Sequence, residues 1–191
     1  MAGATILVAG YEFDDNAFAD AIYTQLGQYG LYGGSTLEDC VTGDDVNSHA
    51  WAQQEPAYLG LEFTDNVLVN DDGYDLALFE TGHNLDEFGV RLEGQGPGNW
   101  QWYTPIDTGY DNEGGFDINV ALIDLDAFGL ADDSELHRIE IKMFHYKDSI
   151  AQIPMLSIVG ASPSEVPAPA TILLLGTGLV GLVGFRKKFK K

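Results

Sequence analysis

The sequence predicts an all-β protein, a β-sandwich or jelly roll, followed by a linker and a single C-terminal hydrophobic helix. Short apolar or alternating segments recur along the chain with turn-forming residues about every 8–12 positions, which is typical of sandwiches. No amphipathic helical pattern separates these segments, and this argues against a parallel α/β sheet. The predicted parts are a sandwich domain at 1–161, a linker at 162–169, a helix at 170–185 and a basic tail at 186–191.

The first predicted strand is the β-branched run Thr5 to Val8, within the apolar stretch Ala4 to Phe13. Asn16 to Tyr23 is expected to form a helical turn or a loop that closes over the sandwich, and a glycine-rich stretch follows. The next strands are predicted at Tyr58 to Phe63 and at Val67 to Val69.

The second half of the body has the clearer strand patterns. Asp75 to Glu80 is predicted to be a buried strand because its centre is continuously apolar. Phe88 to Glu93 and Phe116 to Leu125 alternate with period two, which indicates one buried face. Leu136 to His145 alternates with one shift of face, and Met155 to Val159 closes the domain.

The composition is strongly acidic, with 9 Lys and Arg against 30 Asp and Glu and a net charge of −21. Outside the C-terminal tail, the only basic residues are Arg91, Arg138, Lys142 and Lys147. Such a surface repels phosphate backbones, so nucleic acid is excluded as a partner. The same charge suits a soluble exported protein and divalent cations.

Two local features bear on export. Cys40 is the only cysteine, so it is either a buried, inert thiol or paired with another molecule. Met1 to Gly10 has no basic region, and its apolar stretch is too short for a signal peptide. Because the tail described next requires export, the start is expected to be truncated or to lie in the mature region.

The C-terminus combines three signals. A short proline motif, Val166, Pro167, Ala168 and Pro169, precedes the uncharged apolar run Ala170 to Phe185. The chain then ends in a cluster of basic residues that begins with Arg186, Lys187 and Lys188. An apolar helix of this length approaches the roughly 30 Å hydrocarbon core, and basic residues after it stay on the cytoplasmic side. A buried core helix is the alternative, but the run has no polar stripe.

This tail resembles the PEP-CTERM sorting signal of exported proteins in Gram-negative bacteria. The resemblance implies recognition by an exosortase-type membrane protease, with a precursor held transiently in the inner membrane. The mature protein would then reach the cell surface or the extracellular matrix. Ala168 stands where the family has glutamate, which bears on whether the tail is cut.

The body resembles galactose-binding-like, or discoidin-like, jelly rolls in three places. These are Val41 to Trp51, Gly60 to Phe63 and Gly73 to Glu80. The resemblance implies a jelly roll with a ligand-recognition role and does not fix the ligand.

Acidic turns are candidates for structural Ca²⁺, which prefers six to eight oxygen ligands. The strongest candidate contains Asp71, Asp72 and Asp75, and another contains Asp44 and Asp45. The alternative is that these residues only form solvated turns. Calcium is the only cofactor that the sequence suggests.

Aromatic residues form the second candidate site: Trp100, Trp102, Tyr103 and Tyr110. Trp100 and Trp102 would project from the same face of a strand, where exposed rings can stack on the apolar faces of sugars. The alternative is that the rings close the core at a hairpin.

No catalytic motif is present, and no catalytic residue is assigned. The sequence therefore predicts a non-enzymatic, exported protein of the cell surface or matrix. Its expected role is carbohydrate binding or adhesion, with extracellular polysaccharide as a partner. A passive acidic matrix or structural protein is one alternative. A hydrolase acting on exopolysaccharide is another, and it needs two carboxyl groups about 5–9 Å apart in a cleft.

Overall fold

The structure is a computed structural model that describes residues 4–143 and 155–165. Strands dominate, and every pair of neighbouring strands is antiparallel, which confirms the all-β prediction. The predicted linker from residue 166, the helix 170–185 and the basic tail 186–191 lie outside the described residues. Within the ranges described, no helix has the length and apolar character needed to cross a membrane.

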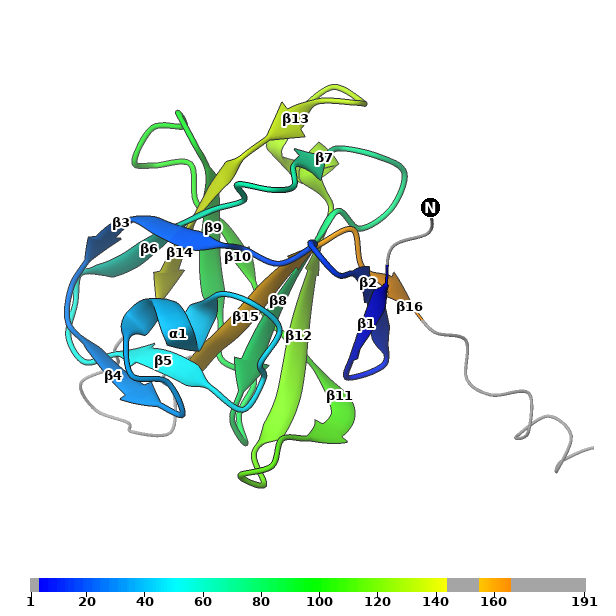
Figure 1. Ribbon diagram of the computed structural model, residues 1–191. Coiled ribbons are helices and arrows are strands. Elements are labelled where there is room, and N and C mark those ends of the chain that lie inside the picture. The colour runs from blue at the N-terminus through cyan, green and yellow to red at the C-terminus, as the bar shows by residue number, and fades with distance from the viewer. Residues whose placement is uncertain (1–3, 144–154, 166–191) are drawn as a thin grey trace, which may run out of the picture.

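Two large sheets form the sandwich (Figure 1). The six-stranded sheet has, in spatial order, β11 (Ile106–Asp111), β12 (Asp117–Ile123), β8 (Leu76–Thr81), β15 (Met155–Ala161), β5 (His49–Ala52) and β4 (Tyr29–Tyr32). The five-stranded sheet has β10 (Gln101–Tyr103), β9 (Phe88–Leu92), β14 (Arg138–Met143), β6 (Ala57–Glu62) and β3 (Ala21–Leu26). The remaining elements are β1 (Thr5–Val8), β2 (Tyr11–Asp14), β7 (Leu68–Val69), β13 (Glu135–Leu136), β16 (Ser164–Glu165), α1 (Leu37–Val41) and the 3₁₀ helix η1 (Leu125–Phe128).

From β5 onward, the chain passes repeatedly from one large sheet to the other. The eight principal strands of this part are, in chain order, β5, β6, β8, β9, β10, β12, β14 and β15. Numbered one to eight, they lie in the order 6-3-8-1 in one sheet and 5-4-7-2 in the other. This is the strand order of a double-sheet jelly roll, and it places residues that are distant in sequence on neighbouring strands.

The main core lies between the two large sheets. In β14, the side chains of Ile139, Ile141 and Met143 are fully buried, while the residues between them are partly exposed. They pack against residues of the facing sheet such as Leu78 and Val159. Strand β8 is buried along its whole length, which confirms the prediction made from its continuously apolar centre. Cys40 is also fully buried in this core, and burial raises the pKa of its thiol.

A small sheet, β1–β2–β16, covers part of the outer side of the six-stranded sheet (Figure 1). A second core lies between them, in which the ring of Phe79 on β8 packs against Tyr11 and Phe13 of β2. In β16, Glu165 is paired with Tyr11. The folded body therefore extends past the predicted boundary at residue 161 and holds the start of the predicted linker.

Some local predictions differ from the structure. Of the two alternatives predicted for Asn16 to Tyr23, the structure shows the loop and not the helical turn, but its last residues, from Ala21, already belong to β3. β4 lies in the glycine-rich stretch, where Gly30 lies directly beneath the ring of Trp51. The five-residue helix α1 was not predicted, although Thr36 and Asp39 form its capping box. These elements are short or lie at sheet edges, where the alternation of buried and exposed residues is weak.

Candidate functional site

The outer face of the five-stranded sheet carries two of the aromatic residues singled out in the sequence. We call this surface the open face; it comprises the outward side chains of β3, β6, β9, β10 and β14. Its central strand β14 presents Arg138, Glu140 and Lys142, all partly exposed. The outer side of the other large sheet is instead partly covered by β1–β2–β16. The open face is therefore the broad sheet surface that is available to a ligand.

Trp102 lies across the backbone of the neighbouring strand. It is opposite Gly89 of β9, which is in turn opposite Lys142 of β14. A Cβ atom added at Gly89 would lie 2.8 Å from the indole of Trp102, so glycine is what allows this close approach. The Lys142 ammonium lies 5.8 Å from the ring centroid, within the range of a cation–π interaction. The side chain remains 39% exposed, which leaves the ring open to a partner.

Trp100 begins a second row of side chains across the open face. The Arg91 guanidinium lies 4.5 Å from the centroid of its ring. Arg91 Nε donates to Glu140 Oε2 at 2.7 Å, and the Tyr23 hydroxyl donates to Glu140 Oε1 at 3.1 Å. Burial, and then the charge of Glu140, raises the pKa of Tyr23, so its hydroxyl stays protonated at neutral pH. The ring of Tyr23 lies over Gly60, where a Cβ atom would be 2.5 Å away.

The charges of the open face are balanced. Arg91, Arg138 and Lys142 are the basic residues of the described ranges, and all of them lie here. Arg138 donates to Glu62 and Glu93 at 2.8 and 2.9 Å, while Arg91 is paired with Glu140. A protein of net charge −21 therefore has one face on which cations and carboxylates offset each other.

The other two predicted aromatic residues lie elsewhere. Tyr103 alternates with Trp102 and points inward, where its ring stacks on Phe128 with centroids 6.5 Å apart. Tyr110 is 54% exposed but lies on β11 of the other large sheet. The expected four-residue cluster is thus divided: the structure brings Trp100 and Trp102 together, and it places Tyr103 at the core and Tyr110 away from the open face.

The acidic turn before β8 is held by its own hydrogen bonds. The Asp75 carboxylate accepts from the backbone N–H groups of Asp71 and Leu125 at 2.9 and 2.8 Å. Asp71 Oδ1 accepts from the N–H of Asp72 at 2.8 Å. Throughout the part of the chain that the structure describes, no three Asp, Glu, His or Cys side chains gather where they could hold a metal ion. Calcium binding at this turn stays a prediction.

The second acidic turn is divided between two roles. Asp45 accepts from the N–H of Asn47 and from the hydroxyl of Ser48, both at 3.0 Å, so it organises the turn. Asp44 instead lines a hollow of about 330 Å³ together with Asp15, Asp20 and Asp65. The structure thus joins Asp44 to acidic residues that the sequence did not connect with it.

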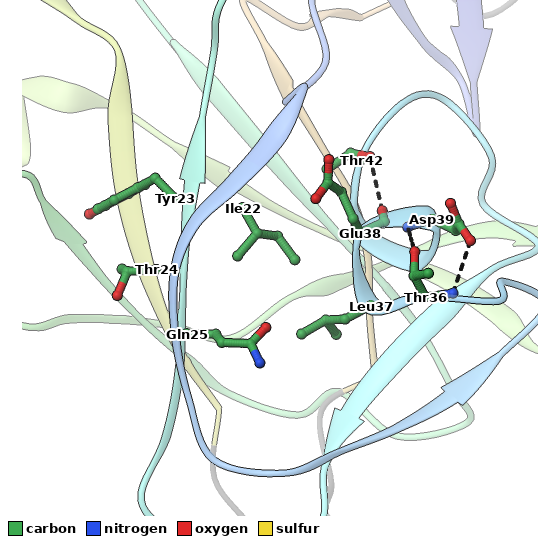
Figure 2. Close-up of a pocket in the computed structure, with 9 residues that line it drawn as sticks. All are labelled: Ile22, Tyr23, Thr24, Gln25, Thr36, Leu37, Glu38, Asp39 and Thr42. Atoms are coloured by element: carbon green, nitrogen blue, oxygen red, sulfur yellow. Dashed lines mark hydrogen bonds between the residues drawn. The ribbon is translucent and has the colours of Figure 1, made fainter.

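A cleft of about 630 Å³ lies between β3 and α1. Figure 2 shows Ile22, Gln25 and Leu37 pointing into the space between these elements, while Tyr23 and Thr24 point to the other side of β3. Two carboxylates line the cleft, and that of Asp39 already accepts from the N–H groups of Ser35 and Thr36. Because Asp39 is committed to capping α1, Glu38 is the one uncommitted carboxylate among the residues that line this cleft.

His49 lies in an aromatic cluster that sequence reasoning missed. Its ring stacks on Tyr32 with centroids 4.9 Å apart and contacts Phe116 and Trp51 at 5.6 and 6.1 Å. These residues come from β4, β5 and the turn before β12, so only the register of the strands brings them together. The side chain is buried, and burial lowers its pKa to about 4.

His49 should make the fold sensitive to acid. Because its pKa is about 4 in the folded state and near 6.5 when unfolded, the unfolded chain binds more protons between these values. The resulting loss of stability begins as the pH falls below about 6.5 and approaches about 3 kcal/mol near pH 4. Urea unfolding of the wild type and of His49→Gln from pH 8 to 4 measures this difference. A constant difference between the two proteins across that range would contradict it.

These features define an acidic β-sandwich protein with one charge-balanced, aromatic open face. The family model of the PEP-CTERM protein-sorting motif matches residues 165–188, which confirms the resemblance seen in the tail. The motif indicates an exported, membrane-processed protein that an exosortase recognises. Its first residue, Glu165, is also the last residue of β16, so the motif starts directly at the folded body.

No curated protein and no solved structure matches the chain. The resemblance of the body to galactose-binding-like jelly rolls is therefore not confirmed by these comparisons.

Proposed function

We propose that this protein is a non-enzymatic polysaccharide-binding protein of the cell surface or matrix, with the open face as its binding surface. The observation that carries the proposal is the exposed ring of Trp102 beside Trp100 on a charge-balanced sheet. Aromatic rings stack on the apolar faces of sugars, and the paired polar groups around them can hydrogen-bond to hydroxyl groups.

The charge distribution favours a neutral polysaccharide. The net charge of −21 repels polyanions at long range, while the open face adds no net charge of its own. A neutral chain of hexoses could therefore lie along the rows of Trp102 and Trp100 without electrostatic cost. Attachment to such a polymer would hold an exported protein in an extracellular matrix.

Trp102→Ala should weaken binding to a neutral polysaccharide by at least about tenfold, because it removes the exposed stacking surface. Affinity electrophoresis of the full chain through gels containing neutral or uronate-rich polysaccharides measures this. Tyr110→Ala is the matched control, since Tyr110 is an exposed aromatic residue on a different surface. Its affinity should equal that of the wild type.

If the folded wild type is not retarded by any of these polysaccharides, the proposal is wrong. Equal losses of affinity in Trp102→Ala and Tyr110→Ala would show that the open face is not a specific binding surface.

A passive acidic matrix protein is the second candidate. It is favoured by the hollow that Asp15, Asp20, Asp44 and Asp65 line, because a concentration of negative charge attracts cations diffusely without selecting among glycans. This role predicts no selective retardation and no effect of Trp102→Ala beyond stability. A hydrolase has less support, since the cleft between β3 and α1 offers only Glu38 beside the committed Asp39.

A further inference from the structure

The interior end of β8 holds a carboxylate that the surrounding structure does not satisfy. Glu80 is fully buried, and its Oε1 atom makes no hydrogen bond. Its Oε2 atom has long contacts, at 3.4 Å from the N–H of Asp86 and 3.4 Å from Asn119 Nδ2, and the backbone of Met155 also hydrogen-bonds to the carboxylate. A buried carboxylate without strong partners is costly, so its presence here requires an explanation.

The neighbours of Glu80 include further acceptors as well as these donors. Asn119 Nδ2 faces Glu80 Oε2 at 3.4 Å and the backbone carbonyls of Gly82 and Asn84 at 3.0 and 3.2 Å. Three oxygen atoms therefore share the two N–H bonds of the Asn119 side-chain amide. The Oε1 atom of Glu80 is a fourth oxygen, and it has no hydrogen bond. The carboxylate of Asp86, half-buried in the same loop, adds a second negative group. Counted with both carboxylates and the two carbonyls, the oxygens around Glu80 outnumber the N–H groups of Asn119, Asp86 and Met155.

We propose that Glu80, Asp86 and Asn119, with the carbonyls of Gly82 and Asn84, form a Ca²⁺ site. Ca²⁺ is bound by mixtures of carboxylate, amide and backbone carbonyl oxygens, whereas Mg²⁺ keeps more of its water. The side chain of Asn119 would turn its amide oxygen, rather than its nitrogen, toward the ion. Only two of the ligands are carboxylates, so this site differs from a cluster of three or more acidic side chains. It is also separate from the turns containing Asp71 and Asp45.

Burial affects both carboxyl groups of the site. Burial, and then the charge of Asp86, raises the pKa of Glu80 to about 8. Burial also raises the pKa of Asp86. The loop that supplies the two carbonyls also contains the exposed residues His83 and Asn84.

Calcium titration of the full chain in detergent micelles tests the proposal. Calorimetry should show one Ca²⁺ per chain, and saturating CaCl₂ should raise Tm by about 5–10 °C over EDTA. MgCl₂ at the same concentration should give a smaller shift. Glu80→Gln should lose the calcium response, and its Tm in EDTA should be close to that of the wild type because glutamine resembles the neutral acid that burial favours at this position. Asp86→Asn is a milder variant at a half-buried position, and it should weaken binding at least tenfold.

The control is Glu87→Gln, which removes an exposed carboxylate from the same loop and should leave the calcium response unchanged. Asp71→Asn distinguishes between the two locations. A full calcium response in Asp71→Asn, together with loss of the response in Glu80→Gln, supports the site at Glu80. Loss of the response in Asp71→Asn with retention in Glu80→Gln and Asp86→Asn would overturn the proposal and place calcium at the acidic turn. The absence of any calcium response in the wild type would also overturn it.

Discussion

Phe79→Ala should lower the free energy of unfolding by about 3–5 kcal/mol, a large fraction of the stability of a domain of this size. Phe79 is fully buried, and its ring lies 6.2 Å from that of Tyr11 and 5.9 Å from that of Phe13. Its removal leaves a cavity between the six-stranded sheet and the small sheet, which these rings join. Urea denaturation of both proteins, with the slope m held in common, measures the loss.

The matched control is Leu7→Ala in β1 of the same small sheet. Leu7 is 65% exposed, so its replacement should change stability by less than about 0.5 kcal/mol. Amide hydrogen exchange should also become faster in β2 of Phe79→Ala, because β2 is held to the body through Tyr11 and Phe13. A loss below about 1 kcal/mol, with unchanged exchange in β2, would show that the small sheet does not depend on Phe79.

Replacing the five basic residues of the C-terminal tail with glutamine should reduce processing in the native host by at least about tenfold. The replaced residues are Arg186, Lys187, Lys188, Lys190 and Lys191. Each basic residue close to an anionic leaflet contributes about 1 kcal/mol, and together they are expected to keep the end of the chain on the cytoplasmic side. Pulse-chase immunoblotting of precursor and mature forms measures the effect.

In the control variant, each lysine among the same five positions is replaced with arginine and the arginine is replaced with lysine. This preserves the charge, so processing should continue at the rate of the wild type. Ala168→Glu supplies the glutamate of the resembled motif and should process at least as fast. Normal processing of the glutamine variant would show that the basic end, although its first three residues belong to the matched sorting motif, does not contribute to recognition.

The strands that could be predicted are those with strong local signals. The continuously apolar centre of β8 and the period-two pattern of β9 identified both strands to within a residue or two. The half-exposed residues of β3 carry no such pattern, because an edge strand has neighbours on one side only. Helix α1 was missed because five residues give no helical period, and only its capping box marks it.

The sorting tail was identified completely from the sequence. Its signals are a proline motif, an apolar run and a basic end in fixed order over residues 166–191, and the family model matches residues 165–188. A membrane and a membrane protease act on this linear order of hydrophobicity and charge, so no long-range contact is needed to read it.

The open face and the pocket at Glu80 were decided by tertiary structure. The sequence placed Trp100 and Trp102 on one side of a strand, but it could not place Lys142 beside them. It also grouped Tyr103 and Tyr110 with them, although one points into the core and the other lies on the opposite sheet. Glu80 meets Asn119 because β8 and β12 pair in one particular register. Local alternation tells which face of a strand a residue occupies, while the neighbours on that face depend on which strands pair and in which register.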